Sequence, residues 1–337
     1  MTEWIALSDA QAITGKAGPG EGLLTRGVFV LEFALPLQGP TVLLDYRADR
    51  GWEIHLSVFA DPQYGISILH RQGATVVRHA LKVTLPEVTR GTGRIVLAWD
   101  APGRRWCMGY ETIDGEGRGT VCQGTDPLPL PFEDVTGLSE GQGMARRSTA
   151  ALWFGFAKGL ALPDRFPWIG PRTPIATPRG LVPAGLLSAN DIVLTVDHGP
   201  LPVTAVRRHV VPTRGSYTPV LLRAPYVSAK SDLLLSSDQR IAMTGVEVEY
   251  LFGEEEVLVE ARHLVNGRSA MLDTRRATTT GIELDFGLPV IVLSDGCRLG
   301  MTSPQDAGAA QPRRVLREFE ATPLVSMLGR TAQLRLG

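Results

Sequence analysis

The sequence predicts an all-β protein of two domains, and three observations support this. Short runs rich in β-branched, leucine and aromatic residues follow one another along most of the chain. In several runs apolar and polar residues alternate, so that Ile54, Leu56 and Val58 fall on one face of a strand. The 37 glycines and 24 prolines supply the turns between these runs. The 337 residues suffice for two domains of ordinary size.

The runs of the first half are predicted to form a β-sandwich, because short strands follow at regular spacing without helical periods. The stretch Asp100-Ala101-Pro102-Gly103 is predicted to turn one hairpin. Residues 114–148 are dense in glycine and proline, and we expect a long excursion there that can carry binding residues. The predicted strands lie at 26–35, 40–48, 52–60, 65–73, 74–85, 93–100, 104–112 and 149–157.

The second half continues with short β-rich runs, and only two segments have helix-like spacing. In residues 255–267, Val257, Ala261 and Leu264 share a helical face, and Asn266-Gly267 is a plausible stop. Residues 313–328 predict a short C-terminal helix. The predicted strands lie at 191–196, 203–211, 217–224, 232–237, 239–243, 246–252, 277–286 and 289–296.

Composition excludes several classes of protein. The formal net charge of −1 disfavours nucleic-acid binding, which requires a basic surface. Three cysteines, without a CxxC pair, disfavour a disulfide scaffold or a cysteine zinc site. No signal peptide is visible, and no apolar stretch reaches the length of a membrane span. We therefore expect no membrane segment, and a location in the cytoplasm, outside the cell by a signal-less route, or on a particle; the assembly state stays open.

The segment from Ile95 to Tyr110 carries a first resemblance. A strand ends in a W-D-x-x-G turn, and the next strand holds aromatic residues and a glycine. This resembles laminin-G/concanavalin-like jelly rolls and implies a β-sandwich over residues 1–160. Such sandwiches bind sugars or protein surfaces, sometimes through calcium.

Candidate ligand contacts in the sandwich follow from this resemblance. Four aromatic residues could stack on sugars, although core packing is an open alternative for them: Trp52, Tyr64, Trp106 and Tyr110. Three aspartates could ligate calcium, although they could equally be turn carboxylates: Asp45, Asp49 and Asp61. No other metal or cofactor is expected.

Residues 164–330 resemble the bacterial branch of the Hedgehog/intein (Hint) family. The resemblance rests on three stretches and on the tail of the chain, which together imply a β horseshoe. They read TPIATPRGLVPAGLLSANDIVLTVDHGPLPV, SDLLLSSDQRIAM, YLFGEEEVLVEARHLVNG and RRVLREFEATPLVSMLGR. A Hint domain performs an acyl shift, in which the side chain of its first residue attacks the preceding carbonyl. That chemistry needs a thiol or hydroxyl and a histidine near the scissile amide.

The residues that the resemblance assigns to this chemistry are replaced. Trp168 stands where the family has its leading cysteine, and Thr173 is the nearest hydroxyl. Gln239 replaces the assisting histidine and cannot shuttle a proton near neutral pH. A later family histidine corresponds to Leu288 or Pro289. Both Trp168 and Gln239 are therefore read as vestigial positions, with no catalytic residue left.

A histidine and a cysteine of this half are also considered as functional residues. His263 is interpreted as structural, and Cys297 as an inert buried thiol that could lie near the vestigial site.

These observations predict a non-enzymatic two-domain protein, in which a lectin-like sandwich binds a glycan or protein surface and an inactive Hint module serves as scaffold. A cell surface or a phage-like particle would suit it. One alternative is self-cleavage near Trp168 by altered chemistry. Another is a glycan-active enzyme in the sandwich, against which the absence of an E-x-D-x-x-E pattern speaks.

Overall fold

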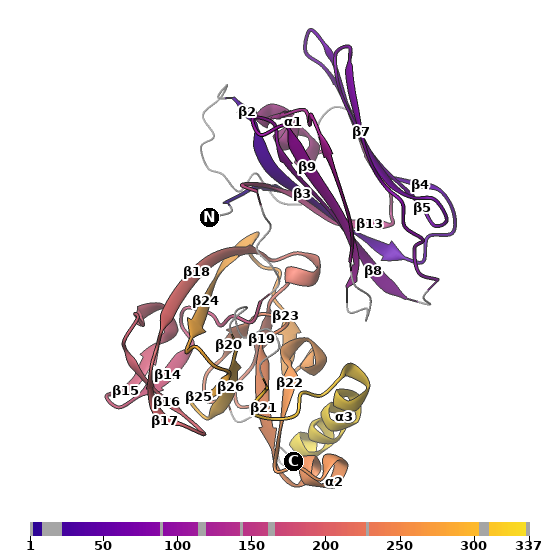
Figure 1. The fold of residues 1–337 in the computed structure, drawn as a ribbon. Coiled ribbons are helices and arrows are strands. Elements are labelled where there is room, and N and C mark those ends of the chain that lie inside the picture. The colour runs from indigo at the N-terminus through magenta and orange to yellow at the C-terminus, as the bar shows by residue number, and fades with distance from the viewer. Residues whose placement is uncertain are drawn as a thin grey trace. The chain divides into compact units, whose positions relative to one another are not determined.

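The computed structural model describes residues 3–8, 22–87, 90–113, 119–141, 144–160, 166–226, 229–302 and 310–334. Most of the N-terminal stretch and residues 161–165, where the second predicted domain begins, therefore lie outside the described residues. The chain divides into two compact units, Met1–Pro163 and Asp164–Gly337. Strands dominate both units (Figure 1), which confirms the all-β prediction. No helix among the described residues is long and apolar enough to cross a bilayer.

The first unit is a sandwich of a six-stranded and a five-stranded antiparallel sheet. The six-stranded sheet has the order β1 (Glu3–Leu7), β13 (Ala151–Lys158), β3 (Arg26–Leu35), β8 (Gly91–Asp100), β9 (Arg105–Ile113), β10 (Thr120–Thr125). The five-stranded sheet has the order β12 (Met144–Arg147), β4 (Thr41–Asp49), β5 (Glu53–Asp61), β6 (Gly65–Gln72), β7 (Thr75–Leu81). The inward residues of both sheets form one hydrophobic core, since side chains alternate between the faces of a strand.

The predicted hairpin at 100–103 is present, because β8 ends at Asp100 and β9 begins at Arg105. The long excursion predicted for 114–148 is wrong for its described part. That segment contains β10, β12, helix α1 (Phe132–Ser139) and β11 (Leu130–Pro131), which pairs with β2 (Leu23–Leu24). The short apolar stretches between its glycines and prolines suffice to extend both sheets.

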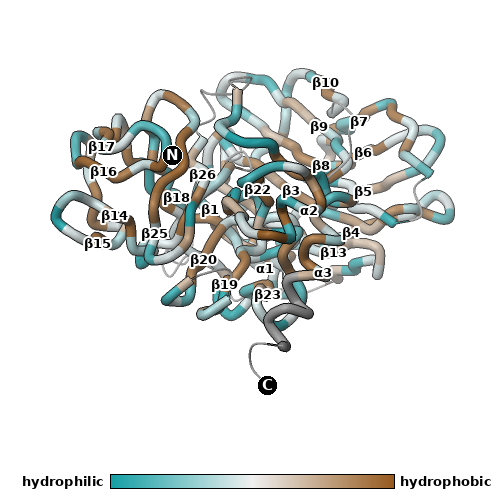
Figure 2. Tube along the Cα trace, turned by 90° about the horizontal axis from the view of Figure 1, so that it is seen from below, coloured by the Kyte–Doolittle hydropathy of each residue, from teal (hydrophilic) through white to brown (hydrophobic). Residues whose placement is uncertain are grey.

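The second unit distributes its strands over several small sheets. The largest has the order β17 (Gly199–Pro202), β16 (Ile192–Thr195), β25 (Val290–Ser294), β26 (Cys297–Met301), β21 (Arg240–Thr244), β22 (Glu256–Glu260). The others are β14 (Pro174–Thr177) with β15 (Gly180–Pro183), β18 (Ala205–Pro212) with β24 (Thr278–Asp285), and β20 (Leu233–Leu235) with β19 (Val220–Leu222) and β23 (Ala270–Leu272). Figure 2 shows hydrophobic residues concentrated along the strands, while many peripheral turns are hydrophilic.

Two predictions of element type in this unit are wrong. The helix expected at 255–267 is strand β22 followed by a 3₁₀ turn at Ala261–Leu264, because Val257 and Val259 favour a strand and pair with β21. The strand expected at 246–252 is helix α2 (Val246–Phe252), which ends at Gly253 in the left-handed conformation with φ 68°. The predicted C-terminal helix is present as α3 (Glu318–Leu334).

The C-terminal segment joins the largest sheet at its β22 edge. Val315 forms a parallel bridge with Leu258, whose N–H donates to Arg314 O and whose carbonyl accepts from Leu316 N–H, both at 2.8 Å. The buried carboxylate of Glu256 joins Arg298 at 2.7 Å and Arg313 at 2.9 Å. The segment that precedes α3 is thereby held by backbone bonds and by charge.

Candidate functional site

Trp168 lies in the interior of the second unit. Its side chain is 4% exposed and packs with Phe166, Val211 and Leu234. Its N–H donates to Ser236 Oγ, and its carbonyl accepts from Ser236 N–H, both at 3.0 Å. The backbone N–H and C=O groups of Trp168 are therefore both held by one residue, Ser236, of a neighbouring segment.

The indole ring of Trp168 rests on the backbone of Gly281 in β24. A Cβ built at Gly281 would lie 2.6 Å from the Cγ and Cδ2 atoms of the indole, closer than real Cβ atoms approach. Glycine is thus needed at this point of β24 so that the ring can approach the backbone of the strand closely. The sequence alone did not reveal this pairing of a large ring with a missing side chain.

Gln239 is fully buried and acts as a connection between strands. Its Nε2 donates to Gly300 O at 2.7 Å and to Arg240 O at 3.0 Å, so both amide protons are engaged. Its N–H closes a turn onto Ser236 O at 3.1 Å. Trp168 and Gln239 are thus linked through Ser236, and the side chain of Gln239 holds β21 to β26.

The other hydroxyl and thiol groups considered from sequence are enclosed. Thr173 is 2% exposed, and its hydroxyl has no partner in the described part of the chain. Burial raises the pKa of the Cys297 thiol to about 11, so this thiol is protonated near neutral pH. Cys297 forms the end of a tight turn with Ser294, whose hydroxyl donates to Pro174 O at 2.7 Å.

One of the six histidines, which the sequence predicts to be structural or solvated, lies against Phe166 of the cluster that packs around Trp168. His209 faces Gly281 across the β18–β24 ladder, and its ring centroid is 4.3 Å from that of Phe166. Its Nε2 lies 3.1 Å from the buried Glu283 carboxylate, which also binds Arg207 at 2.6 Å. The residues are 74 apart in sequence, so only the strand register brings them together. His263, by contrast, lies 3.6 Å from Glu260, in keeping with a structural role.

The four candidate stacking residues of the first unit do not form one surface. Trp52 and Tyr64 are 55% and 79% exposed, but they lie in the turns at opposite ends of β5. Tyr110 is buried in the core. Trp106 is half-buried and lies edge-on to His79, with ring centroids 4.5 Å apart. Any stacking by Trp52 or Tyr64 would therefore involve separate ends of the sheet.

The three aspartates considered for calcium are also apart. Asp45 lies 2.6 Å from His55 Nε2; burial raises its pKa, but the bond and charge of His55 and the charge of Arg47 lower it further, so the net shift is downward. Asp49 and Asp61 accept backbone N–H bonds within their own turns. No group of three or more possible metal ligands occurs among the described residues.

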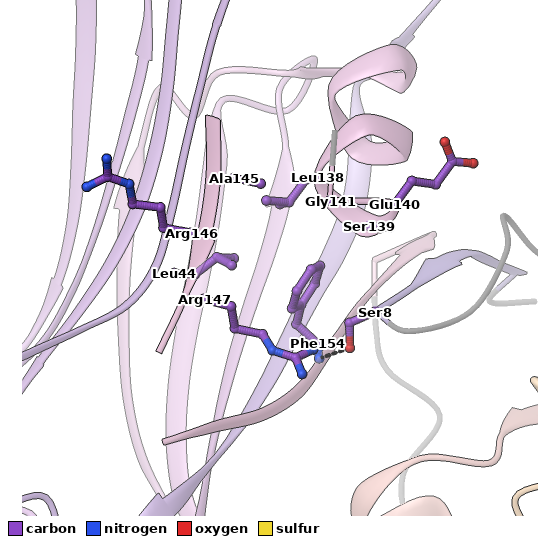
Figure 3. Close-up of a pocket in the computed structure, with 10 residues that line it drawn as sticks. All are labelled: Ser8, Leu44, Leu138, Ser139, Glu140, Gly141, Ala145, Arg146, Arg147 and Phe154. Carbon is purple, nitrogen blue, oxygen red and sulfur yellow. Dashed lines mark hydrogen bonds between the residues drawn. The ribbon is translucent and has the colours of Figure 1, made fainter. Parts of the chain in front are cut away.

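The first unit also contains a cavity of about 650 Å³ between β12, the end of α1 and the end of β1 (Figure 3). Its base consists of Leu44, Leu138 and Phe154, which are almost completely buried, so a ligand would meet mainly the rim. Arg147 points toward Phe154 in Figure 3, and Glu140 is the sole carboxylate among the described residues of its lining. Glycoside hydrolysis usually requires two carboxylates, so this cavity does not resemble a glycosidase site.

Comparison with known proteins agrees with the sequence reading of the second unit. Residues 170–301 match the family model described as a Hint domain, which confirms the recognition from sequence. Trp168 precedes the matched segment by two residues. No curated protein sequence matches the chain significantly.

Solved structures similar to the chain fall into two groups. The AceL NrdHF class 3 split intein is 13% identical, with a TM-score of 0.29, and covers 40% of this chain and 97% of its own. The carbohydrate-binding module CBM40 of the Ruminococcus gnavus IT-sialidase is 10% identical, with a TM-score of 0.30, covering 41% and 79%. Domains LG4-5 of the mouse laminin α1 chain are 9% identical, with a TM-score of 0.28, covering 89% and 75%. These similarities are weak, and nothing about ligands follows from them.

Proposed function

We propose that this chain is a non-catalytic binding protein, in which a Hint-type domain persists as a scaffold and the β-sandwich supplies the binding surface. The observation that carries the proposal is the burial of Trp168 at the position that the resemblance assigns to the nucleophile. The ring of Trp168, packed on Gly281, has no thiol or hydroxyl with which this residue could attack the preceding carbonyl.

The surroundings of Trp168 support the same conclusion. The acyl shift needs a group that protonates the leaving amine, and the Gln239 amide cannot do this. Both of its protons are already engaged by backbone carbonyls. The thiol of Cys297 is no substitute nucleophile, since its raised pKa keeps it protonated.

Two features of the sandwich support a binding role: the lining of its cavity and the outward face of its five-stranded sheet. Among the described residues, its cavity is lined by one carboxylate rather than by a catalytic pair. Most outward positions of its five-stranded sheet are polar, and all of those from β12 to β7 are exposed or half-buried, which leaves a surface that a partner can contact. A glycan or a protein surface is therefore the proposed partner.

Intact-mass measurement of the purified chain tests the loss of cleavage. We expect a single mass after incubation with dithiothreitol or hydroxylamine, which release thioester and ester intermediates. The Trp168→Cys, Gln239→His double variant is the matched comparison, because it restores both residue types. Fragments of the parent chain divided near Trp168 would refute the proposal and favour self-cleavage by altered chemistry.

A further inference from the structure

The five-stranded sheet of the first unit carries two adjacent rows of outward side chains. The register places one row, from β12 to β7, as Arg146, Asp45, Ser57, Leu69 and Arg78. The next outward row is Met144, Arg47, His55, Arg71 and Val76. All ten are exposed or half-buried, while the residues between the rows on β4, β5 and β6 are buried beneath the sheet. At the usual spacing between strands, each row is about 19 Å long.

Arginine is the most frequent residue in the two rows. They contain four guanidinium groups and one carboxylate, that of Asp45, which His55 and Arg47 engage. Arg71 binds Glu53, which lies at the hairpin end of β5. The next outward pair on β4 and β5, Asp49 and Glu53, is acidic, so the uncompensated positive charge of the two rows lies at the remaining two arginines.

Two of the arginines lack an acidic partner. Within the described part of the chain, no residue forms a hydrogen bond or ion pair with the guanidinium group of Arg78 or of Arg146, and both residues are exposed. They stand at the two ends of the same row, four strands apart. Arg146 and Arg147 both line the cavity, but their side chains extend in different directions in Figure 3, as expected for neighbouring residues of a strand.

We propose that this outward face binds an anionic glycan, an extended polysaccharide that carries carboxylate or sulfate groups. Guanidinium groups bind such oxyanions through paired hydrogen bonds. The Asp45–His55 pair and the hydroxyl of Ser57 between the arginines supply acceptors and donors for sugar hydroxyls. Charge complementarity selects a polyanion, and the breadth of the rows suits a chain rather than a small molecule.

This inference rests on the proposed binding role of the sandwich and names its ligand class. Binding to immobilised heparin, alginate and neutral dextran is measured at low and high salt with the full chain. We expect binding to heparin or alginate that weakens with salt, and none to dextran. Heparin and alginate together distinguish sulfate from carboxylate as the recognised group. Duplex DNA and phosphatidylserine vesicles serve as other polyanions.

The Arg78→Gln, Arg146→Gln double variant should weaken binding roughly tenfold, since two charge-assisted contacts are lost. The matched control is Arg104→Gln, Arg105→Gln, which removes the same charge from the β8–β9 turn of the other sheet, where these side chains are 76% and 72% exposed. The control should bind within about twofold of the parent, because it leaves the rows intact.

Three results would overturn the inference: no binding of the parent to heparin or alginate, equal loss in both double variants, or tighter binding to DNA or vesicles than to either glycan. Because these readouts are independent of chain cleavage, failure here leaves the intact-mass result unaffected.

Discussion

Lowering the pH from 7 to 5 should destabilise the sandwich through two histidines buried between its sheets. His70 and His79, 3% and 1% exposed, border a small void against Leu97 and Trp99 of the opposite sheet. Burial lowers the pKa of His70 from 6.5 to about 3, with a contribution from the charge of His79. Burial likewise lowers the pKa of His79 to about 4.

Hydrogen bonding independently favours neutral His70. The Gln72 amide donates to Pro129 O, so the nitrogen that faces His70 Nε2 at 3.3 Å is a donor. His70 Nε2 must then accept, which it can do only when it is unprotonated. If His70 Nε2 were protonated, two N–H donors, from His70 and Gln72, would face each other in the core.

The size of the expected loss in free energy of unfolding follows from proton linkage. Below pH 6.5 the unfolded chain binds protons that the folded sandwich excludes, so the free energy of unfolding falls as the pH falls. At pH 5 each histidine contributes a loss of about 2 kcal/mol, and the pair about 4 kcal/mol. This is a large share of the roughly 5–15 kcal/mol that stabilises an ordinary domain. The lowered pKa of Asp45 acts only below pH 4 and does not enter this window.

Urea unfolding at pH 7, 6 and 5 followed by pulse proteolysis and mass analysis measures each unit separately. His79→Phe should remove about half of the pH dependence of the sandwich, since one titrating group is lost. His198→Gln, an exposed histidine of the second unit, is the control and should leave the sandwich unchanged. A sandwich that loses less than about 1 kcal/mol between pH 7 and 5 would refute the reasoning.

The remaining predictions concern the second unit. Trp168→Cys should lower its free energy of unfolding by roughly 2–5 kcal/mol, as large-to-small core substitutions do, and a variant as stable as the parent in urea would show that the ring contributes no packing. Gly281→Ala should cost about 1–3 kcal/mol in the parent but much less beside Trp168→Ala, and a double-mutant cycle without coupling would contradict the contact between ring and strand. Cys297 should resist iodoacetamide at pH 8 until the chain unfolds, whereas rapid labelling of the native protein, located by peptide mass, would be inconsistent with its buried, protonated thiol.

Local patterns in the sequence predicted the strands of the sandwich because burial follows alternation there. Ile54, Leu56 and Val58 alternate with outward His55 and Ser57 in the structure as the sequence indicates. The same rule failed for α2, where valine and glutamate alternate but Gly245 and Gly253 bound a helix of two turns. A short segment can match both the two-residue period of a strand and the 3.6-residue period of a helix. Here the flanking glycines indicate the helix.

The candidate site was predictable only in part. That residue 168 carries no thiol or hydroxyl follows from its residue type alone. The support of its ring by Gly281 and the pairing of His209 with Glu283 depend on the register between β18 and β24, which no local pattern specifies. The outward arginine rows likewise require the order of five strands, and β12 was expected to lie in a loop.

The parallel bridge between Val315 and Leu258 has a practical consequence for handling the second unit. The segment that forms it covers the outer edge of β22, and Leu316 and Leu324 behind it are buried in the core. A fragment trimmed to residues 170–301 would expose the unpaired N–H and C=O groups of β22 and uncover apolar surface beside them. Such a strand edge is a template for pairing between molecules, so the shortened domain should self-associate where the longer one does not. A fragment of this domain should therefore extend past residues 170–301, the segment that matches the family model, and include α3.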